Sequence, residues 1–173
     1  MDFYKVIRTR RSVRSFKKEP IPDEVLNRVL DTARVAPSGG NRQPWKFILV
    51  KDERLRQRMV AACNDQKFMM DAPLIVVACG QKLPINRGGY MGEMSILLDV
   101  SIAFTHLILA ARAEGLGTCW IGAFNNKEIK KLLKVPNEYE VVAATPLGYP
   151  STDVFTNPGN RKNLDEIVSL NKF

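Results

Sequence analysis

Histidine is nearly absent from this sequence of 173 residues, since His106 is the one histidine in the chain. The H-E-x-x-H motif and any zinc site built on several imidazoles are therefore excluded, because each needs more than one histidine. A Ser-His-Asp or Cys-His site would have to use His106, which lies in an apolar stretch, and the G-x-S-x-G motif is missing. We interpret His106 as a core or interface residue.

Cysteine is also scarce, with Cys63, Cys79 and Cys119 far apart in the chain. An odd count without a C-x-x-C pair argues against a disulfide scaffold or a zinc site. We expect three buried, reduced thiols that behave as small apolar residues. Residues 1–20 are charged and contain no apolar core of a signal peptide, so we expect a cytoplasmic protein.

The glycine-rich phosphate loops are missing as well. There is no P-loop and no EF-hand loop. Gly115 and Gly117 begin something like a dinucleotide fingerprint, but the third glycine is absent and the pair follows an expected helix instead of a strand, which excludes a Rossmann site. If the protein is an enzyme, its chemistry is therefore expected to come from a bound cofactor.

The overall composition is that of an ordinary globular protein, with 45% hydrophobic and 25% charged residues. The length predicts a single domain over residues 1–173. The formal net charge is +8, and seven basic against two acidic residues within residues 1–20 place +5 of it at the N-terminus. Such a cluster suits a phosphorylated ligand, a nucleic acid or an anionic surface.

Apolar periodicity and breaker residues predict helices and strands in alternation, which favours an α+β sandwich. The expected helices span 3–9, 52–62, 92–114 and 125–134, and a further helix is expected to start within residues 21–24 and stop within residues 36–40. The expected strands span 45–50, 73–79, 118–121 and 139–147. Residues 149–163 are expected to be irregular, and residues 164–170 to form a last helix or an extended arm.

The longest apolar stretch, residues 92–114, is interpreted as a buried helix. Asp99 would be costly inside a membrane, so we expect no membrane span. A domain of this size has little interior to surround so long a helix. We therefore expect part of it to pack against a second subunit.

Four short segments carry side chains that could bind a ligand. Two adjacent arginines and a hydroxyl suit a terminal phosphate, and small residues allow close approach of backbone to a ligand. Taken singly, each segment is also an ordinary surface turn, loop or exposed charge. The segments are Arg10-Arg11-Ser12-Val13-Arg14-Ser15-Phe16, Pro37-Ser38-Gly39-Gly40-Asn41-Arg42-Gln43-Pro44-Trp45, Gly115-Leu116-Gly117-Thr118-Cys119-Trp120-Ile121-Gly122-Ala123 and Arg161-Lys162.

Together and in this order, the four segments resemble the nitroreductase superfamily of flavin-dependent oxidoreductases. Asp71-Ala72-Pro73 and the long helix also fit, and the resemblance runs from about residue 3 to residue 170. It implies a three-layer sandwich with a central, mostly antiparallel sheet flanked by helices. It also implies a homodimer with exchanged C-terminal segments and two FMN molecules at the subunit interface.

The resemblance also implies a role for each candidate residue. Arg10, Arg11, Ser12 and Arg161 would bind the phosphate and ribityl chain of FMN. Arg14 would contact the N1/O2 edge of the flavin. The other subunit would line the flavin with Pro37, Ser38, Gly39 and Asn41. Gln66 is the candidate for the pyrimidine edge. Near N5 we expect Trp120, Ile121, Gly122 and Ala123, with the Gly122 N–H facing it.

The implied activity is hydride transfer from NAD(P)H through the flavin to nitroaromatic, quinone or related small acceptors, by a ping-pong mechanism without a side-chain acid or base. Gly159 stands where many relatives have a lysine, which leaves one cation fewer for the phosphate. The short Gly80–Gly92 segment favours an open flavin face over the longer lids of deiodinases and flavin destructases. A flavin-binding sensor or store without turnover is the alternative. A nucleic-acid-binding module lacks a recognised motif.

Overall fold

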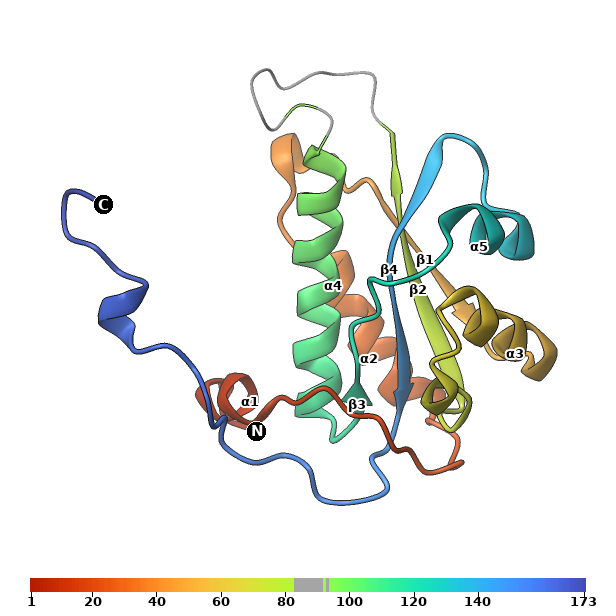
Figure 1. Cartoon of the computed structure of the whole chain (residues 1–173), viewed down its shortest axis with the longest axis horizontal. Coiled ribbons are helices and arrows are strands. Elements are labelled where there is room, and N and C mark those ends of the chain that lie inside the picture. Colours follow the sequence, from red (N-terminus) through yellow and green to blue (C-terminus); the bar gives the residue numbers. More distant parts are fainter. Residues whose placement is uncertain (83–91, 93) are drawn as a thin grey trace.

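The computed structural model describes residues 1–82, 92 and 94–173. Most of the Gly80–Gly92 segment, and with it the expectation about a short lid, lies outside the described residues. The helices and strands alternate as expected for an α+β protein (Figure 1). They are α1 (Phe3–Thr9), α2 (Asp23–Arg34), β1 (Trp45–Val50), α3 (Glu53–Ala62), β2 (Leu74–Gln81), α4 (Ser95–Ala113), β3 (Gly117–Thr118), α5 (Asn126–Leu133) and β4 (Tyr139–Gly148).

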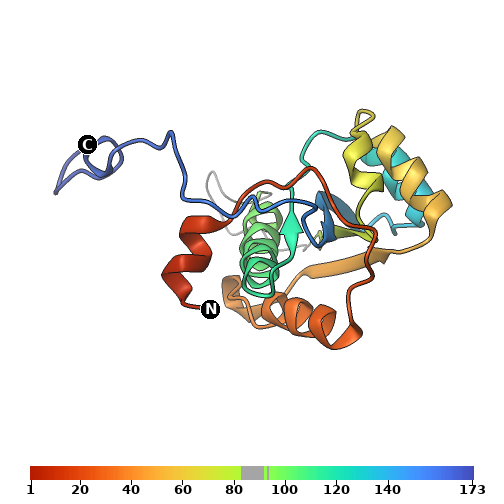
Figure 2. The ribbon, with the colours of Figure 1, turned by 90° about the horizontal axis from the view of Figure 1, so that it is seen from below.

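The four strands form one antiparallel sheet in the order β1-β2-β4-β3. Side chains alternate between the two faces of β2: Val76 and Ala78 lie in the cluster with α2 and α4, whereas Ile75 and Val77 face the cluster with α3 and α5. Both faces are therefore covered by helices, which explains why β2 is apolar almost throughout. This is the three-layer sandwich with a central antiparallel sheet that the family resemblance implies (Figure 2).

α4 is the central helix of the fold, packed against α2 and all four strands. Its length and hydropathy also meet the criterion for a membrane span, which core helices of globular proteins meet as well. Phe104 and Leu107 are fully buried, and the polar Asp99 and Arg112 are almost as deeply buried. α4 is thus the buried helix expected from residues 92–114, beginning three residues later.

The helix ends follow local chemistry. Asp2, Asp52 and Asn125 each accept a backbone hydrogen bond from the residue three positions on, which caps α1, α3 and α5. α4 ends at Ala113 and is followed by Gly115, whose φ of +78° is the left-handed conformation that glycine adopts without strain.

The structure differs from the sequence expectation at two places. The strand expected over residues 118–121 is shorter, because β3 covers Gly117–Thr118 and only Ile121 beyond it forms a bridge, to Ala144. The C-terminal segment is an extended arm with a single 3₁₀ turn at Leu164–Glu166. The arm leaves the body beside α1 and projects away from it (Figure 1).

Candidate functional site

The N-terminal motif lies along β3, at the edge of the sheet. Ser12 forms a parallel bridge with Thr118, and the Val13 N–H donates to the Thr118 carbonyl at 2.8 Å. A Cβ atom added to Gly117 would lie 2.8 Å from the Cβ of Val13, so this close approach requires glycine. Two of the sequence motifs are therefore parts of one surface.

A cluster of positive charge forms where α1 ends. Partial burial lowers the pKa of Arg10, and the nearby charges of Arg11 and Arg161 lower it further. Arg161 of the C-terminal arm therefore lies close enough to Arg10 to act on it electrostatically. No carboxylate forms an ion pair with these three arginines among the residues that the structure describes. Like charges gathered in this way favour an anionic ligand.

Arg10 and Arg11 are not equivalent. The Arg11 guanidinium donates to the carbonyls of Arg8 at 3.1 Å and Arg10 at 2.6 Å, and also to the Thr156 carbonyl. No side-chain hydrogen bond of Arg10 occurs within the described part of the chain. Arg11 therefore ties the end of α1 to the root of the arm, residues 153–156, whereas the Arg10 guanidinium makes no such tie among the residues described.

Phe68 connects Arg14 with the segment that holds Gln66. The Arg14 guanidinium carbon lies over the ring of Phe68, 5.8 Å from its centroid. Phe68 belongs to the short 3₁₀ helix Lys67–Met70. Gln66 directly precedes this helix, and its Nε2 donates to the Cys63 carbonyl at 3.1 Å. The segment that holds Gln66 thus approaches the N-terminal motif through Phe68, which the sequence motifs did not single out.

Cys119 lies beneath the N-terminal motif. Burial raises the pKa of its thiol, and the charges of Arg14 and Arg10 and a hydrogen bond with Ser12 act in the opposite direction. The backbone N–H of Cys119 donates to the Thr145 hydroxyl at 2.9 Å. Cys119 is thus a buried residue held by Thr145, and its thiol experiences the charges of Arg10 and Arg14.

The loop that follows Cys119 presents Trp120, Gly122 and Ala123 at the surface. Trp120 is 40% exposed and packs edge-on against Phe104 of α4, with ring centroids 4.8 Å apart. Ile121 is only 2% exposed, and its N–H and carbonyl both pair with Ala144. Ile121 therefore anchors the loop, and its neighbours are the residues that a ligand could reach.

The Pro37–Asn41 loop is attached to the other end of α4. The Gly39 N–H donates to the Asp99 carboxylate at 3.1 Å, and the Ser38 hydroxyl accepts from the Gln43 N–H at 2.9 Å. Arg112, next to the basic cluster, lies thirteen residues beyond Asp99. At 1.5 Å per residue this is about 20 Å along the helix. Within one chain the structure therefore separates this loop from the arginine cluster.

Comparison with known proteins gives the family. The sequence model of the Nitroreductase family matches residues 7–67 and 61–149. The chain belongs to the Nitroreductase family. A relative from Archaeoglobus fulgidus, described as a candidate NADH dehydrogenase/NAD(P)H nitroreductase, is 33% identical over 168 residues and covers 94% of each chain.

Two further relatives show the breadth of this nitroreductase family fold. The crystal structure of a nitroreductase family protein from Clostridium difficile superposes with a TM-score of 0.85 at 31% identity and covers 100% of each chain. The iodotyrosine deiodinase of Thermotoga neapolitana is 30% identical over 196 residues and covers 98% of each chain. The relatives support an oxidoreductase function, and their named activities differ.

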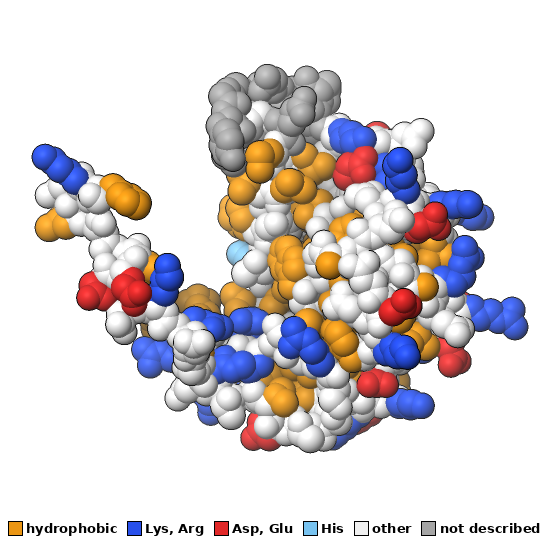
Figure 3. All heavy atoms as spheres, in the orientation of Figure 1, with side chains coloured by type: hydrophobic (Ala, Val, Ile, Leu, Met, Phe, Trp, Pro, Cys, Tyr) orange, Lys and Arg blue, Asp and Glu red, His pale blue; other side chains and the backbone are white. Residues whose placement is uncertain are grey.

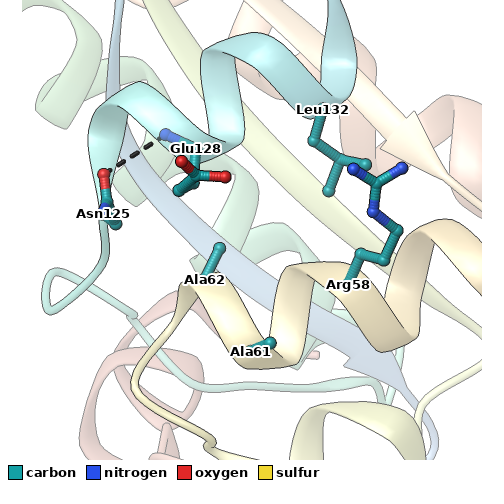
Figure 4. A pocket seen from close by; sticks show the side chains of 6 residues that line it. All are labelled: Arg58, Ala61, Ala62, Asn125, Glu128 and Leu132. Carbon is teal, nitrogen blue, oxygen red and sulfur yellow. Dashed lines mark hydrogen bonds between the residues drawn. The ribbon is translucent and has the colours of Figure 1, made fainter.

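One hollow among the described residues lies away from these motifs. It has a volume of about 290 Å³ and separates α3 from α5 (Figure 4). Arg58 and Leu132 border one end of it, and the Asn125 cap of α5 borders the other. None of its lining residues belongs to the four motifs of this Nitroreductase family protein. We therefore assign the site to the edge beside β3 and not to this hollow.

Three residues that contact or adjoin the predicted site segments belong to no motif: Phe68, Asp99 and Arg112. Asp99 and Arg112 interrupt the apolar pattern of α4, and a polar residue at a buried position is the sequence signal that could have singled them out. Phe68 carries no such signal, because an aromatic residue beside a buried strand is ordinary core.

Proposed function

We propose that the protein is an FMN-dependent NAD(P)H oxidoreductase. The observation that carries the proposal is the cluster of Arg10, Arg11 and Arg161, which has no carboxylate partner within the described residues. The bridge of Ser12 with Thr118 joins the same motif to the segment that leads into the exposed loop at Gly122. A phosphate at one end of a ligand would neutralise the cluster, and a planar ring system could lie along the loop. FMN combines these two features.

The residues present fit this cofactor. Arg10, Arg11, Ser12 and Arg161 would hold the phosphate and ribityl chain, and Gln66 would meet the pyrimidine edge. Bound FMN would supply the redox chemistry, taking up hydride from NAD(P)H and passing it to an acceptor. The absence of a free histidine or a carboxylate from the motifs agrees with chemistry that comes from a cofactor.

Arg14 has a supporting electrostatic role in this proposal. A fixed guanidinium beside the flavin stabilises negative charge that develops on reduction, which raises the reduction potential. The Phe68 ring, whose centroid is 5.8 Å from the guanidinium carbon, is the aromatic neighbour of Arg14 in this position. The backbone N–H groups around Gly122 are held in place because Ile121 pairs with Ala144 on both sides.

The proposed assembly is a homodimer. The loop of Pro37, Ser38, Gly39 and Asn41 and the arginine cluster lie at opposite ends of α4, so one flavin would meet both only with the help of a second copy. Side chains at spacings of three and four leave an apolar stripe exposed on α4 (Figure 3). The stripe comprises Met94, Leu97, Leu98 and Ile102. The exposed apolar residues of the arm, Leu164, Ile167, Val168 and Leu170, would pack against the partner.

Donor and acceptor would use one flavin face in turn, which gives ping-pong kinetics. Nitroaromatic and quinone compounds are the proposed acceptors, since such planar molecules would suit the exposed surface around Trp120. We place the protein in the cytoplasm, because its three thiols are free and buried.

The deciding experiment is the visible spectrum of the purified protein, before and after anaerobic addition of NADH or NADPH. A flavin spectrum that bleaches with either donor is the expected result. A flavin spectrum that persists with both would favour a flavin-binding protein without NAD(P)H turnover. A colourless protein that takes up no added FMN would overturn the proposal.

A further inference from the structure

A buried arginine occupies the last turn of α4. Arg112 is 5% exposed, and no carboxylate forms an ion pair with it within the described ranges. Burial lowers the pKa of Arg112, and the charge of Asp153 partly opposes this effect. A guanidinium remains charged in proteins, so its burial needs specific compensation.

The compensation comes from two segments that are far apart in the sequence. The Nε of Arg112 donates to the Thr9 hydroxyl at 3.0 Å, and that hydroxyl donates to the Lys5 carbonyl at 2.6 Å. The guanidinium carbon of Arg112 lies 3.9 Å from the centroid of the Phe155 ring. One side chain therefore contacts both the end of α1 and the root of the C-terminal arm.

Both contacts are next to the arginine cluster. Thr9 directly precedes Arg10, and Phe155 directly precedes Thr156, whose carbonyl accepts from Arg11. Arg161 follows Thr156 by five residues and lies in an exposed segment of the arm. The separation between Arg161 and Arg10 therefore depends on where the arm is fixed, and Arg112 contacts the arm at Phe155.

We propose that Arg112 is a positioning residue for the phosphate site: it clamps the arm root, residues 153–156, to the end of α1 and so keeps Arg161 beside Arg10. This inference rests on the proposed FMN function. Arg112 itself is covered by the segments that it joins and contacts no ligand. Its effect on phosphate binding passes through Arg161.

The clamp needs an arginine and not merely a positive charge. The planar guanidinium stacks on Phe155 while its Nε donates to Thr9, and a lysine ammonium cannot make both contacts in this geometry. Arg112→Lys and Arg112→Met should therefore both open the clamp. Phe155→Leu removes the ring from the opposite side and should have the same effect as either substitution of Arg112.

Comparison of FMN with riboflavin tests the inference, because riboflavin lacks the phosphate. Flavin fluorescence quenching would give both dissociation constants for each variant. Arg112→Met should weaken FMN binding about tenfold, the size expected for loss of one contact to a charged group, and leave riboflavin binding unchanged. Arg28→Met is the matched control, since Arg28 pairs with Glu114 at the same end of α4 and touches neither segment.

A double-mutant cycle tests the route through Arg161. Arg112→Met should have no further effect on FMN affinity in an Arg161→Ala background. Additive losses in this cycle would overturn the proposal. It would also be overturned if each variant lost FMN and riboflavin affinity equally, or if FMN affinity were unchanged in Arg112→Lys, Arg112→Met and Phe155→Leu.

Hydrogen exchange of the flavin-free protein separates the clamp from the proposed function. The amides of residues 153–157 should exchange faster in Arg112→Met and Phe155→Leu than in the wild type and in Arg28→Met. Unchanged exchange would refute the clamp even if FMN binds. If the wild-type protein binds no FMN, the proposed function fails, and faster exchange would still establish the clamp as a contact of the arm.

Discussion

The carboxylate of Asp99 accepts a hydrogen bond of 3.1 Å from the backbone N–H of Gly39. Asp99 is 3% exposed and lies in a helix that is otherwise largely apolar. Burial of a carboxylate is costly unless hydrogen bonds compensate for it. Asp99, a charged residue in an apolar helix, thus fixes the loop between α2 and β1. This loop contains Pro37, Ser38 and Asn41.

Substitution of Asp99 should distinguish charge from hydrogen bonding. Asp99→Asn keeps a carbonyl oxygen for the Gly39 N–H, whereas Asp99→Leu removes the acceptor. We expect Asp99→Leu to lower the free energy of unfolding by at least about 1 kcal/mol more than Asp99→Asn does. Urea titration monitored by circular dichroism measures both values. Equal stability of the two variants would show that the contact with Gly39 contributes nothing.

Arg10 and Arg11 should respond differently to truncation. The Arg11 guanidinium donates hydrogen bonds to the carbonyls of Arg8, Arg10 and Thr156. Arg11→Ala should therefore lower the unfolding free energy of the flavin-free protein by about 1 kcal/mol. Arg10→Ala should leave that stability unchanged or raised, because it relieves repulsion from Arg11 and Arg161.

FMN titration gives the second half of this contrast. Arg10→Ala should weaken FMN binding about tenfold or more and make the binding less sensitive to salt, because one charge contact is lost. Lys127→Ala, on the exposed side of α5, is the control and should change neither stability nor FMN binding. FMN binding that is unaffected by Arg10→Ala would place the phosphate elsewhere.

The fold could be predicted where local chemistry decides the structure. β1 was expected at residues 45–50 and occurs there, because an apolar run lies between Pro44 and the acidic cap at Asp52. The extent of β3 could not be predicted, because regular pairing with β4 is interrupted after Thr118 and resumes only at the bridge of Ile121 with Ala144, and that is a tertiary effect. The path of the C-terminal arm is likewise undetermined by its own sequence.

The candidate site could be predicted only in part from the sequence. The motifs identified the arginines as candidates. The sequence does not show that the Arg11 side chain donates to backbone carbonyls whereas the Arg10 side chain makes no such hydrogen bond within the described residues. Arg112 and Asp99 could be noticed as polar residues in an apolar helix, but their partners, Thr9 and Gly39, lie 103 and 60 residues away in the chain. Long-range pairing of this kind follows from packing and leaves no local pattern.

The exposed stripe on α4 predicts a dimer that charge should disrupt. Leu98 and Ile102 are four residues apart and lie on one face of the helix, 46% and 40% exposed. A carboxylate at either position would have to be buried unpaired in a dimer interface, which is strongly unfavourable. Leu98→Asp and Ile102→Asp should therefore yield monomers, whereas the wild type should be a dimer.

Light scattering coupled to size exclusion measures this directly at micromolar concentration. Ala61→Asp introduces the same charge on an exposed position of α3, on the opposite side of the sheet, and should leave the dimer intact. A wild-type monomer would contradict the proposed assembly. Loss of the dimer should also lower FMN affinity, because the loop at Ser38 and the arginine cluster would no longer meet.

Cys63 and Cys79 lie in the core cluster on the face of the sheet that α3 and α5 cover. Their thiols should make the protein less stable at alkaline pH. Burial raises the pKa of Cys63 and of Cys79 from 9.0 to about 11. Between these values the folded chain retains protons that the unfolded chain has lost, so the free energy of unfolding falls as the pH rises from about 9 to about 11. By pH 10 the loss should be on the order of 1 kcal/mol for each thiol.

Lysines and tyrosines also ionise in this range, so the thiol contribution must be taken as a difference. Urea titrations between pH 8 and pH 10 should show a smaller decline for Cys63→Ala than for the wild type, whatever the cost of the substitution at pH 8. A disulfide reagent should likewise modify Cys63 and Cys79 only when the protein unfolds, because the thiolate is the reactive form. Rapid modification of either residue in the native protein at pH 8 would mean that this half of the core opens without global unfolding.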